Sequence, residues 1–248
     1  MDIPTSHPRY QSLMLRHRLI EGFKTGLATD SALLAHGRGE AFDYLLGEKT
    51  WDFAQEAIAV TSAMLIQAKR PVFSVNGNTA SLADTEIIDL VKTLDKLILE
   101  VNLFYHTDGR SQKIAAHLKS LGAPHVFESA VNPAVILPGV DSARRKMNPQ
   151  GISQADLVLV AIEDGDRANA LVNAGYKVIA IDLNPMSRTA QTAHISIVDE
   201  TTRVLKALTD QLKRDATVSE DILSSRIKNY DNKKILDRAI TAIRSGSL

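Results

Sequence analysis

The chain has 248 residues, of which 44% are hydrophobic and 23% charged, the composition of an ordinary globular protein that can bury a core. Its 29 Lys and Arg residues balance its 29 Asp and Glu residues, so no overall positive field favours a nucleic-acid partner. The absence of cysteine excludes disulfides, thiolate nucleophiles and cysteine-ligated metal centres.

Residues 1–70 are expected to form a helical segment. Apolar residues recur at helical spacing from Ser6 to about Phe23, and Ser6 is the expected cap. A shorter helix is expected over 31–36 and a third over 52–68. The first residues lack the basic and apolar regions of a secretory signal, so we expect a cytoplasmic protein.

From Pro71 onward, short β-branched runs alternate with helical segments. The expected strands are 72–75, 97–103, 157–162, 178–181 and 195–198. Runs that are apolar on both faces and separated by helices predict a mostly parallel sheet with helices on both sides. The predicted fold class is therefore α/β: one domain with a Rossmann-like, doubly wound core over 71–204 and C-terminal helices over 205–248. The longest apolar run, 157–162, is too short to cross a membrane, and no membrane partner is expected.

Small and polar residues follow each expected strand, where open parallel sheets bind their ligands. After the first strand come Asn76, Gly77, Asn78 and Thr79, whose backbone amides could cradle a phosphate at the start of a helix. The same residues are equally compatible with an isolated tight turn. The chain contains neither the G-x-G-x-x-G fingerprint of dinucleotide sites nor a Walker loop.

The second strand ends at Asn102, which offers a hydroxyl both a donor and an acceptor, and Arg110 follows where it could reach an anion. Taken alone, each is more typical of a turn or a solvated charge. The segment 133–151 is expected to be a crossover or an active-site loop.

Three carboxylates, Glu163, Asp164 and Asp166, follow the apolar strand at 157–162 within a few residues of one another. Such a cluster can bind magnesium, hold a cationic amine or accept a proton from one, because its carboxylates disfavour one another's ionisation. The alternative is that one of the aspartates only caps the following helix.

The last two strands also end in polar loops, which contain Asp182, Leu183, Asn184, Arg188 and Thr189 after one strand and Asp199 and Glu200 after the other. An acidic residue at a strand end suits ribose hydroxyls, and an arginine at a helix start suits phosphates. These two neighbouring loops favour a binding site over isolated turns.

Outside the sheet, Gly37 and Gly39 bracket Arg38 and could give it the backbone freedom to project toward a polyphosphate. The alternative is a helix that ends at a glycine, with a surface arginine after it. The 7 histidines are scattered without the spacing of metal ligands, so no metal site of the protein's own is expected.

Taken together, these segments resemble the archaeal phosphopantothenate synthetase family. The resemblance is carried by SHPRY at 6–10, AHGRGEAFDYL at 35–45, SVNGN at 74–78, VNLFY at 101–105, EDGDR at 163–167 and IDLNP at 181–185. The segments match in order and spacing to about Arg203, and the C-terminal helices match weakly.

The resemblance implies an ATP-dependent ligase of archaeal coenzyme A biosynthesis. Such an enzyme joins 4-phosphopantoate to β-alanine and releases AMP and pyrophosphate. Members of the family look like homodimers, so the resemblance also implies a homodimer. On this chain the resemblance places nucleotide contacts at Arg16, Arg38, Asp182, Leu183, Asn184, Arg188, Thr189, Asp199 and Glu200.

The residues accommodate that chemistry. Arg16 and Arg38, together with Mg²⁺, would neutralise charge on the leaving pyrophosphate. Glu163, Asp164 or Asp166 would hold the ammonium of β-alanine and take its proton. The phosphate and hydroxyl of phosphopantoate would lie against the turn at 76–79, Asn102 and Arg110.

Two other classes of protein remain open at this point. A nicotinamide-dependent reductase would also use a doubly wound sheet with acidic strand ends, although the missing glycine fingerprint argues against it. A non-catalytic regulator that senses a nucleotide or sugar phosphate would bind such ligands without turnover.

Overall fold

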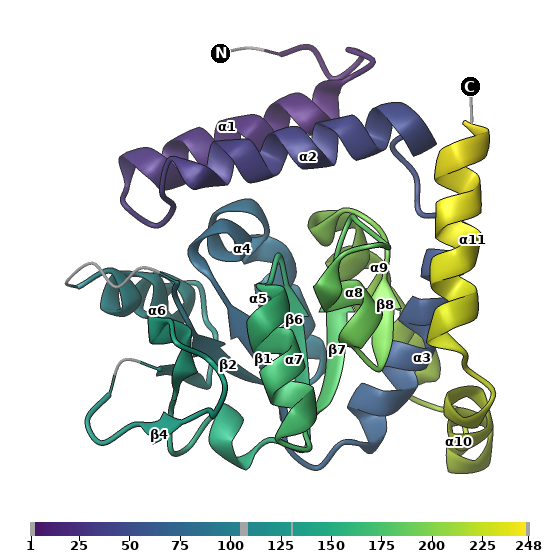
Figure 1. Ribbon diagram of the computed structural model, residues 1–248. Helices are drawn as coiled ribbons and strands as arrows, with labels where there is room; N and C mark the ends of the chain where they lie inside the picture. Colours follow the sequence, from purple (N-terminus) through teal and green to yellow (C-terminus); the bar gives the residue numbers. More distant parts are fainter. Residues whose placement is uncertain (1–2, 105–108, 130, 247–248) are drawn as a thin grey trace.

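A computed structural model describes residues 3–104, 109–129 and 131–246, and its centre is a six-stranded parallel sheet (Figure 1). The strands are β1 (Pro71–Val75), β2 (Ile98–Val101), β3 (Val126–Glu128), β6 (Leu157–Ala161), β7 (Lys177–Ile181) and β8 (Ile195–Ile197). Their order is β3-β2-β1-β6-β7-β8. The chain builds outward from β1 in one direction, returns to β6 and builds outward in the other, which confirms the predicted doubly wound sheet.

Of the six strands in this sheet, β3 is the one that the sequence does not predict. It has three residues, Val-Phe-Glu, at the edge of the sheet, and only Val126 is fully buried. So short a run carries too little of an apolar pattern to distinguish a strand from a loop. The central strands, in contrast, are buried along their whole length, with Phe73 paired to Leu99 on one side and Leu159 on the other.

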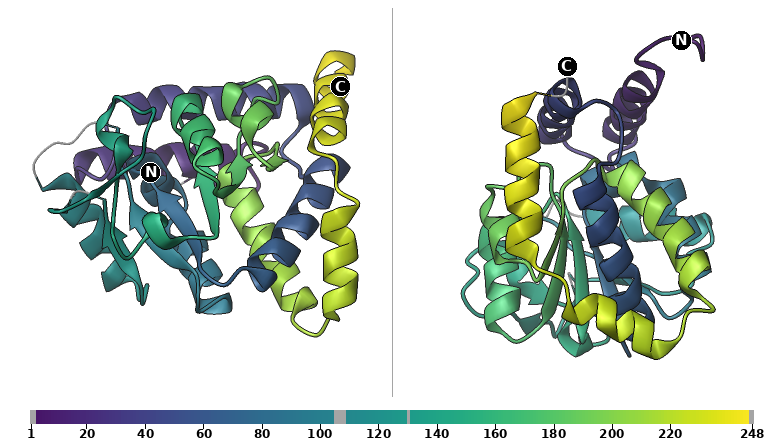
Figure 2. Two further views of the ribbon diagram at one scale, coloured as in Figure 1. Left: turned by 60° about the horizontal axis from the view of Figure 1, so that its bottom comes forward. Right: turned by 90° about the vertical axis from the view of Figure 1, so that its right-hand side faces the viewer.

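The helices form a layer on each face of the sheet (Figure 2). They are α1 (Tyr10–Lys24), α2 (Ser31–Leu46), α3 (Asp52–Gln67), α4 (Gly77–Leu82), α5 (Asp84–Thr93), α6 (Arg110–Ser120), α7 (Gly165–Asn173), α8 (Arg188–Thr192), α9 (Thr201–Asp215), α10 (Glu220–Lys228) and α11 (Asn232–Ser245). The apolar side chains of α3, α5, α6 and α9 form one core with one face of the sheet. None of the described helices combines the length and the apolar character that a membrane span needs.

The second face of the sheet packs against α7 and against the segment that the sequence predicts to be a crossover or active-site loop. That segment contains an antiparallel pair, β4 (Val135–Ile136) and β5 (Lys146–Met147), and two short 3₁₀ turns, Ala143–Arg145 and Ile152–Gln154. Leu137, Met147 and Ile152 are buried against the sheet. The loop therefore has a packed, fixed position beside the carboxyl end of β2.

Two expectations about the N-terminal helices are wrong. The first helix begins at Tyr10 and not near Ser6, because the preceding residues form a turn in which the His7 amide donates to the Pro4 carbonyl at 2.9 Å. The second helix does not end at His36 but continues through Gly37 and Gly39 to Leu46. Packing against neighbouring elements outweighs the roughly 1 kcal/mol that each interior glycine costs a helix.

Helices α1 and α2 lie side by side across one end of the sheet, and the end of α11 lies beside α2 (Figure 1). That end is the carboxyl end of the strands, since the residues that share a cavity with α2 are those that directly follow the strands. Arg38 therefore projects from a helix face and not from a flexible loop.

Candidate active site

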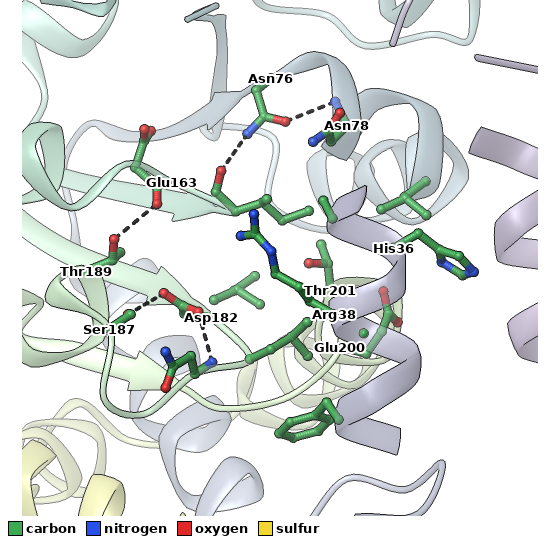
Figure 3. Close-up of a pocket in the computed structure, with 18 of the residues that line it drawn as sticks. His36, Arg38, Asn76, Asn78, Glu163, Asp182, Ser187, Thr189, Glu200 and Thr201 are labelled. Atoms are coloured by element: carbon green, nitrogen blue, oxygen red, sulfur yellow. Dashed lines mark hydrogen bonds between the residues drawn. The ribbon is translucent and has the colours of Figure 1, made fainter. Parts of the chain in front are cut away.

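A cavity of about 890 Å³ lies between α2 and the carboxyl ends of the strands (Figure 3). The predicted site residues that line it are Arg38, Asn76, Gly77, Asn78, Arg110, Glu163, Asp164, Asp182, Leu183, Asn184, Arg188, Thr189, Asp199 and Glu200. The predicted residues that do not line it are Arg16, Thr79, Asn102 and Asp166. The structure thus brings segments from both halves of the sheet to one cavity at the reversal of strand order, where sheets of this kind bind ligands.

Arg38 and Asp182 share this cavity. Arg38 extends from α2 into the cavity (Figure 3), and its positive charge acts on the Asp182 carboxyl. Burial raises the pKa of Asp182, while the Ser187 hydroxyl, which donates to Oδ2 at 2.5 Å, and the Asn184 amide, which donates to Oδ1 at 3.0 Å, oppose the rise. These bonds fix the Asp182 carboxyl, a hydrogen-bond acceptor, in the cavity that Arg38 enters.

Arg203 connects α2 to the end of β8. Its Nη2 donates to Asp43 Oδ1 on α2 at 2.7 Å and to Asp199 Oδ1 at 2.6 Å. Burial alone would lower the pKa of Arg203, but its bonds to Asp43 and Asp199 raise it. Burial raises the pKa of Asp199, and the arginine charge opposes that rise. The three groups hold the helix that carries Arg38 against the sheet.

Glu200 combines two positions: it lines the cavity and it caps α9. Its carboxylate accepts the Thr202 amide at 2.8 Å and the Arg203 amide at 3.1 Å. Burial raises the pKa of this carboxyl, which the cap bonds oppose. Thr201, which the sequence analysis does not single out, also lines the cavity beside it (Figure 3).

The Asn76 side chain is occupied by structural bonds. It accepts the amides of Asn78 and Thr79, both at 3.0 Å, and donates to the Ala161 carbonyl at 2.9 Å, so that it caps α4 and joins β1 to β6 (Figure 3). Thr79 is fully buried beneath the cavity. Gly77 and Asn78 also line the cavity.

Arg110 lies beside Gly77 in the cavity wall, and its Nε donates to the Leu27 carbonyl at 3.2 Å. Burial lowers the pKa of Arg110, and among the described residues no carboxylate opposes that shift. A Cβ atom at position 77 would lie 2.4 Å from both the Leu27 carbonyl oxygen and Arg110 Nη2, so only glycine fits there. The result is a half-buried cation without a counter-ion among the residues that the structure describes.

Asn102 is buried outside the cavity wall. Its Nδ2 donates to the Lys146 carbonyl at 2.9 Å, which fixes the start of β5, and so the loop between β4 and β5, at the end of β2. Its neighbours Leu103 and Phe104 line the cavity instead. Tyr105, part of the family resemblance, lies outside the described residues.

The three clustered carboxylates point to different partners. Glu163 accepts from Arg144 Nη1 and, at 2.5 Å, from Arg167 Nη1, and its side chain is almost fully buried. Asp166 pairs with Arg188 on the exposed surface. Asp164 lines the cavity, where its Oδ1 accepts the Asp166 amide at 3.1 Å as the cap of α7. Glu163 and Asp164 thus line one cavity, as expected, whereas Asp166 lies outside its wall.

Two arginines behind this cluster are absent from the sequence prediction. Arg167 is completely buried, and its Nη1 also donates to the Ser74 hydroxyl at 3.0 Å. Arg144, from the loop between β4 and β5, lines the cavity. Burial lowers the pKa of Arg144 to about 9 and of Arg167 to about 10. The basic run at 144–146 was visible in the sequence, but its contact with residue 163 depends on the folded loop.

Arg16 is exposed on α1. Its charge, together with burial as the larger cause, lowers the pKa of His36 on α2. Arg16 therefore lies on the side of α1 that faces α2, close to the cavity but outside its wall.

The described residues contain no group of three or more His, Cys, Asp or Glu side chains that could hold a metal ion. A magnesium ion at this site would take most of its ligands from phosphate oxygens and water, as Mg²⁺ commonly does in nucleotide sites.

A doubly wound sheet with a cavity over its switch point, walled by strand-end acids and an arginine-bearing helix, is the arrangement in which α/β proteins of this class bind small ligands. A profile described as phosphopantothenate/pantothenate synthetase matches residues 53–246. The chain belongs to this family.

Curated relatives agree over nearly the whole chain. A protein of Thermococcus onnurineus is 44% identical over 242 residues, which cover 98% of this chain and 92% of that protein. One of Methanosarcina mazei is 44% identical over 98% of this chain and 94% of its own, and one of Methanospirillum hungatei is 50% identical over 82% of each. All three are named 4-phosphopantoate--beta-alanine ligase.

Proposed function

We propose that the protein joins 4-phosphopantoate to β-alanine in an ATP-dependent reaction that yields 4′-phosphopantothenate, AMP and pyrophosphate, a step of coenzyme A biosynthesis. The observation that carries the proposal is that segments 35–45, 74–78, 163–167 and 181–185, which carry the family resemblance, all contribute residues to one cavity. Its volume of about 890 Å³ is in the range of pockets that hold a nucleotide and a small acid.

In the first step, a carboxylate oxygen of phosphopantoate attacks the α-phosphorus of ATP. The bond from that phosphorus to the β-bridging oxygen breaks, pyrophosphate leaves with the electron pair, and an acyl adenylate remains. Arg38, which extends into the cavity, stabilises the charge that develops on the leaving group, and Arg16 supports it from α1. A magnesium ion bound to the triphosphate would add to this charge neutralisation.

The nucleotide lies over the β7 and β8 half of the cavity in this proposal. Asp182, fixed by Ser187 and Asn184, accepts hydrogen bonds from ribose hydroxyls. Arg188 and Thr189 lie toward the phosphates, while Leu183 and the Asp199–Glu200 pair form the rest of the wall.

Phosphopantoate lies over the β1 and β2 half, with its phosphate against Arg110 and the backbone of Gly77 and Asn78. A half-buried arginine that has no carboxylate partner in the described part of the chain suits a phosphate dianion. Asn76, Thr79 and Asn102 hold the walls in place and do not contact the substrate directly.

In the second step, the nitrogen of β-alanine attacks the acyl carbon, the bond from that carbon to the adenylate oxygen breaks, and AMP leaves. The ammonium must first lose a proton. Asp164 is the acid that accepts it, because Glu163 is neutralised by two arginines and Asp166 lies outside the cavity wall.

The proposal also includes that two copies of the chain form the active protein and that it acts in the cytoplasm. Large apolar side chains on the N-terminal helices support an interface there, with Leu34 72% and Tyr44 60% exposed. Light scattering coupled to size-exclusion chromatography tests the dimer.

The assay for the reaction measures pyrophosphate and AMP from ATP. Sustained release is expected only when phosphopantoate and β-alanine are both present, and unphosphorylated pantoate is the comparison substrate. A sensor would bind ATP without turnover, and a reductase would bind NADH or NADPH in a fluorescence titration. Either result, without pyrophosphate release, refutes the proposal.

A further inference from the structure

A neutral cluster of charges with a positive and a negative end borders the cavity at the carboxyl end of β6. Arg144 and Arg167 supply two positive charges, and Glu163 and Asp164 supply two negative ones. Glu100 on β2 also acts on Arg167, and burial raises the pKa of Glu100 to about 7, so this carboxyl is largely neutral below that pH. One oxygen, Glu163 Oε1, accepts from Arg144 Nη1 and also, at 2.8 Å, from the Asp164 amide, so the guanidinium and Asp164 lie next to one another. The Asp164 charge acts on both arginines.

Both ends of this cluster retain unused bonding capacity. The guanidinium of Arg144 has five N–H donors, and among the described residues only Nη1 has an acceptor. The Arg144 side chain is only 8% exposed, and its Nε is buried without a hydrogen-bond partner among the described residues. On Asp164, Oδ1 caps α7 and Oδ2 accepts no hydrogen bond from the described part of the chain. Unpaired donors on a buried arginine are costly unless a ligand supplies acceptors.

The charge pattern differs beside Gly77, where Arg110 lines the cavity. Arg110 has no opposing carboxylate among the described residues and so favours a ligand with net negative charge. The cluster at β6 is balanced, and a dianion there would meet Asp164 and Glu163 as well as Arg144. A zwitterion satisfies both of its ends at once, with a carboxylate on the guanidinium and an ammonium on Asp164.

On the basis of the function proposed above, we infer that Arg144 binds the carboxylate of β-alanine and thereby selects an amino acid over other amines as the acyl acceptor. The Phe104 ring, whose centroid lies 5.8 Å from Arg144 Cζ, flanks the guanidinium. The packed segment behind it, with Met147 and Ile152 buried against the sheet, fixes the backbone that carries it.

The test compares β-alanine with β-alaninamide, which keeps the amine and replaces the carboxylate by a neutral group of similar shape. In Arg144→Gln, kcat/KM for β-alanine falls on the order of 30-fold and that for β-alaninamide changes little, so the preference of the wild-type enzyme for β-alanine is lost. Arg144→Lys keeps the charge and the Glu163 contact without the planar fork, and it recovers part of the preference. Arg145→Gln, which removes an exposed arginine one residue along, keeps the wild-type preference.

Exchange of labelled pyrophosphate into ATP, measured with phosphopantoate and without an amine, separates this role from others. We expect the exchange rate and the KM for phosphopantoate to stay within about twofold of wild type in Arg144→Gln and Arg144→Lys. A raised KM for phosphopantoate in exchange, with the amine preference unchanged in both variants, overturns the inference alone. A wild-type protein without phosphopantoate-dependent exchange overturns the proposed function, and the inference with it.

Discussion

The contact between Asp43 and Arg203 is expected to set the affinity for ATP. It joins α2, the helix that carries Arg38, to the N-terminal end of α9 beside β8. The two side chains are largely buried, with 11% of Asp43 and 21% of Arg203 exposed. Asp43→Asn keeps the size and shape of the side chain and removes its charge, so it loosens α2 without opening a void.

The magnitude follows from the two bonds that Asp43 accepts, at 2.7 and 3.1 Å. Asparagine keeps one acceptor and places an NH₂ group opposite an arginine donor, so one charge-assisted bond weakens and the other is lost, for a total of about 2 kcal/mol. Arg203 retains Asp199, which limits the loss. If all of this energy held α2 in the ATP-binding position, KM for ATP would rise at most about 30-fold, since 1.4 kcal/mol corresponds to a factor of ten.

Initial rates of pyrophosphate release at saturating phosphopantoate and β-alanine give the KM for ATP. We expect a rise of about tenfold in Asp43→Asn, with KM for β-alanine unchanged. Asp210→Asn is the matched control, because Asp210 is an exposed residue of α9 whose nearest cation, Lys213, lies at 4.0 Å. A variant with a lowered melting temperature but an unchanged KM for ATP would show that the contact stabilises the fold without positioning Arg38.

Three further predictions concern other parts of the cavity. Gly77→Ala places a Cβ 2.4 Å from a backbone carbonyl oxygen, so it should cost about 1–3 kcal/mol in urea unfolding and raise KM for phosphopantoate; wild-type stability would contradict the crowding. Asp164→Asn should lower kcat/KM for β-alanine about 100-fold while pyrophosphate exchange continues, and loss of exchange would place Asp164 in the first step instead. Burial raises the pKa of Glu100 from 4.5 to about 7, so between these pH values the folded protein keeps a proton that the unfolded chain has lost, and stability should fall by at most roughly 3 kcal/mol as pH rises through this window. Urea unfolding at several pH values should show that slope in the wild type and not in Glu100→Gln; equal slopes would refute the assignment.

The sequence predicts the sheet well because burial of a parallel strand on both faces leaves a local signal. The runs at 157–162 and 178–181 are continuous apolar segments, and 72–75 is interrupted only by Ser74; each becomes a central or near-central strand. Local signals also mislead: the glycines at 37 and 39 indicate a break, yet α2 continues through both because its packing outweighs their low helix propensity.

The site is predicted where it follows directly from strand ends and is missed where it depends on distant pairing. Asp182 and Asp164 can be found from their positions after apolar runs. Arg144, in contrast, reaches the cavity only because the segment after β4 packs across the second face of the sheet. The Asp43 partner of Arg203 lies 160 positions away in the chain, and no local pattern relates them.

In the proposed function, the order of the strands lets two substrates and a nucleotide share one cavity. Loops from β1 and β2 fan to one side of the switch point and loops from β7 and β8 to the other, so a small acid and a nucleotide can approach each other from opposite halves of the sheet. Glu163 and Asp164 follow β6, the strand that pairs with β1 on one side and β7 on the other. The acyl group must pass from the adenylate to the amine at the junction of the two halves of the sheet. The charged cluster at β6 lies at that junction. A proton acceptor at the outer strands, such as Asp199, would be separated from the small acid by the nucleotide itself. Asp164, which follows β6, is therefore better suited to the second step than the acids that follow β8.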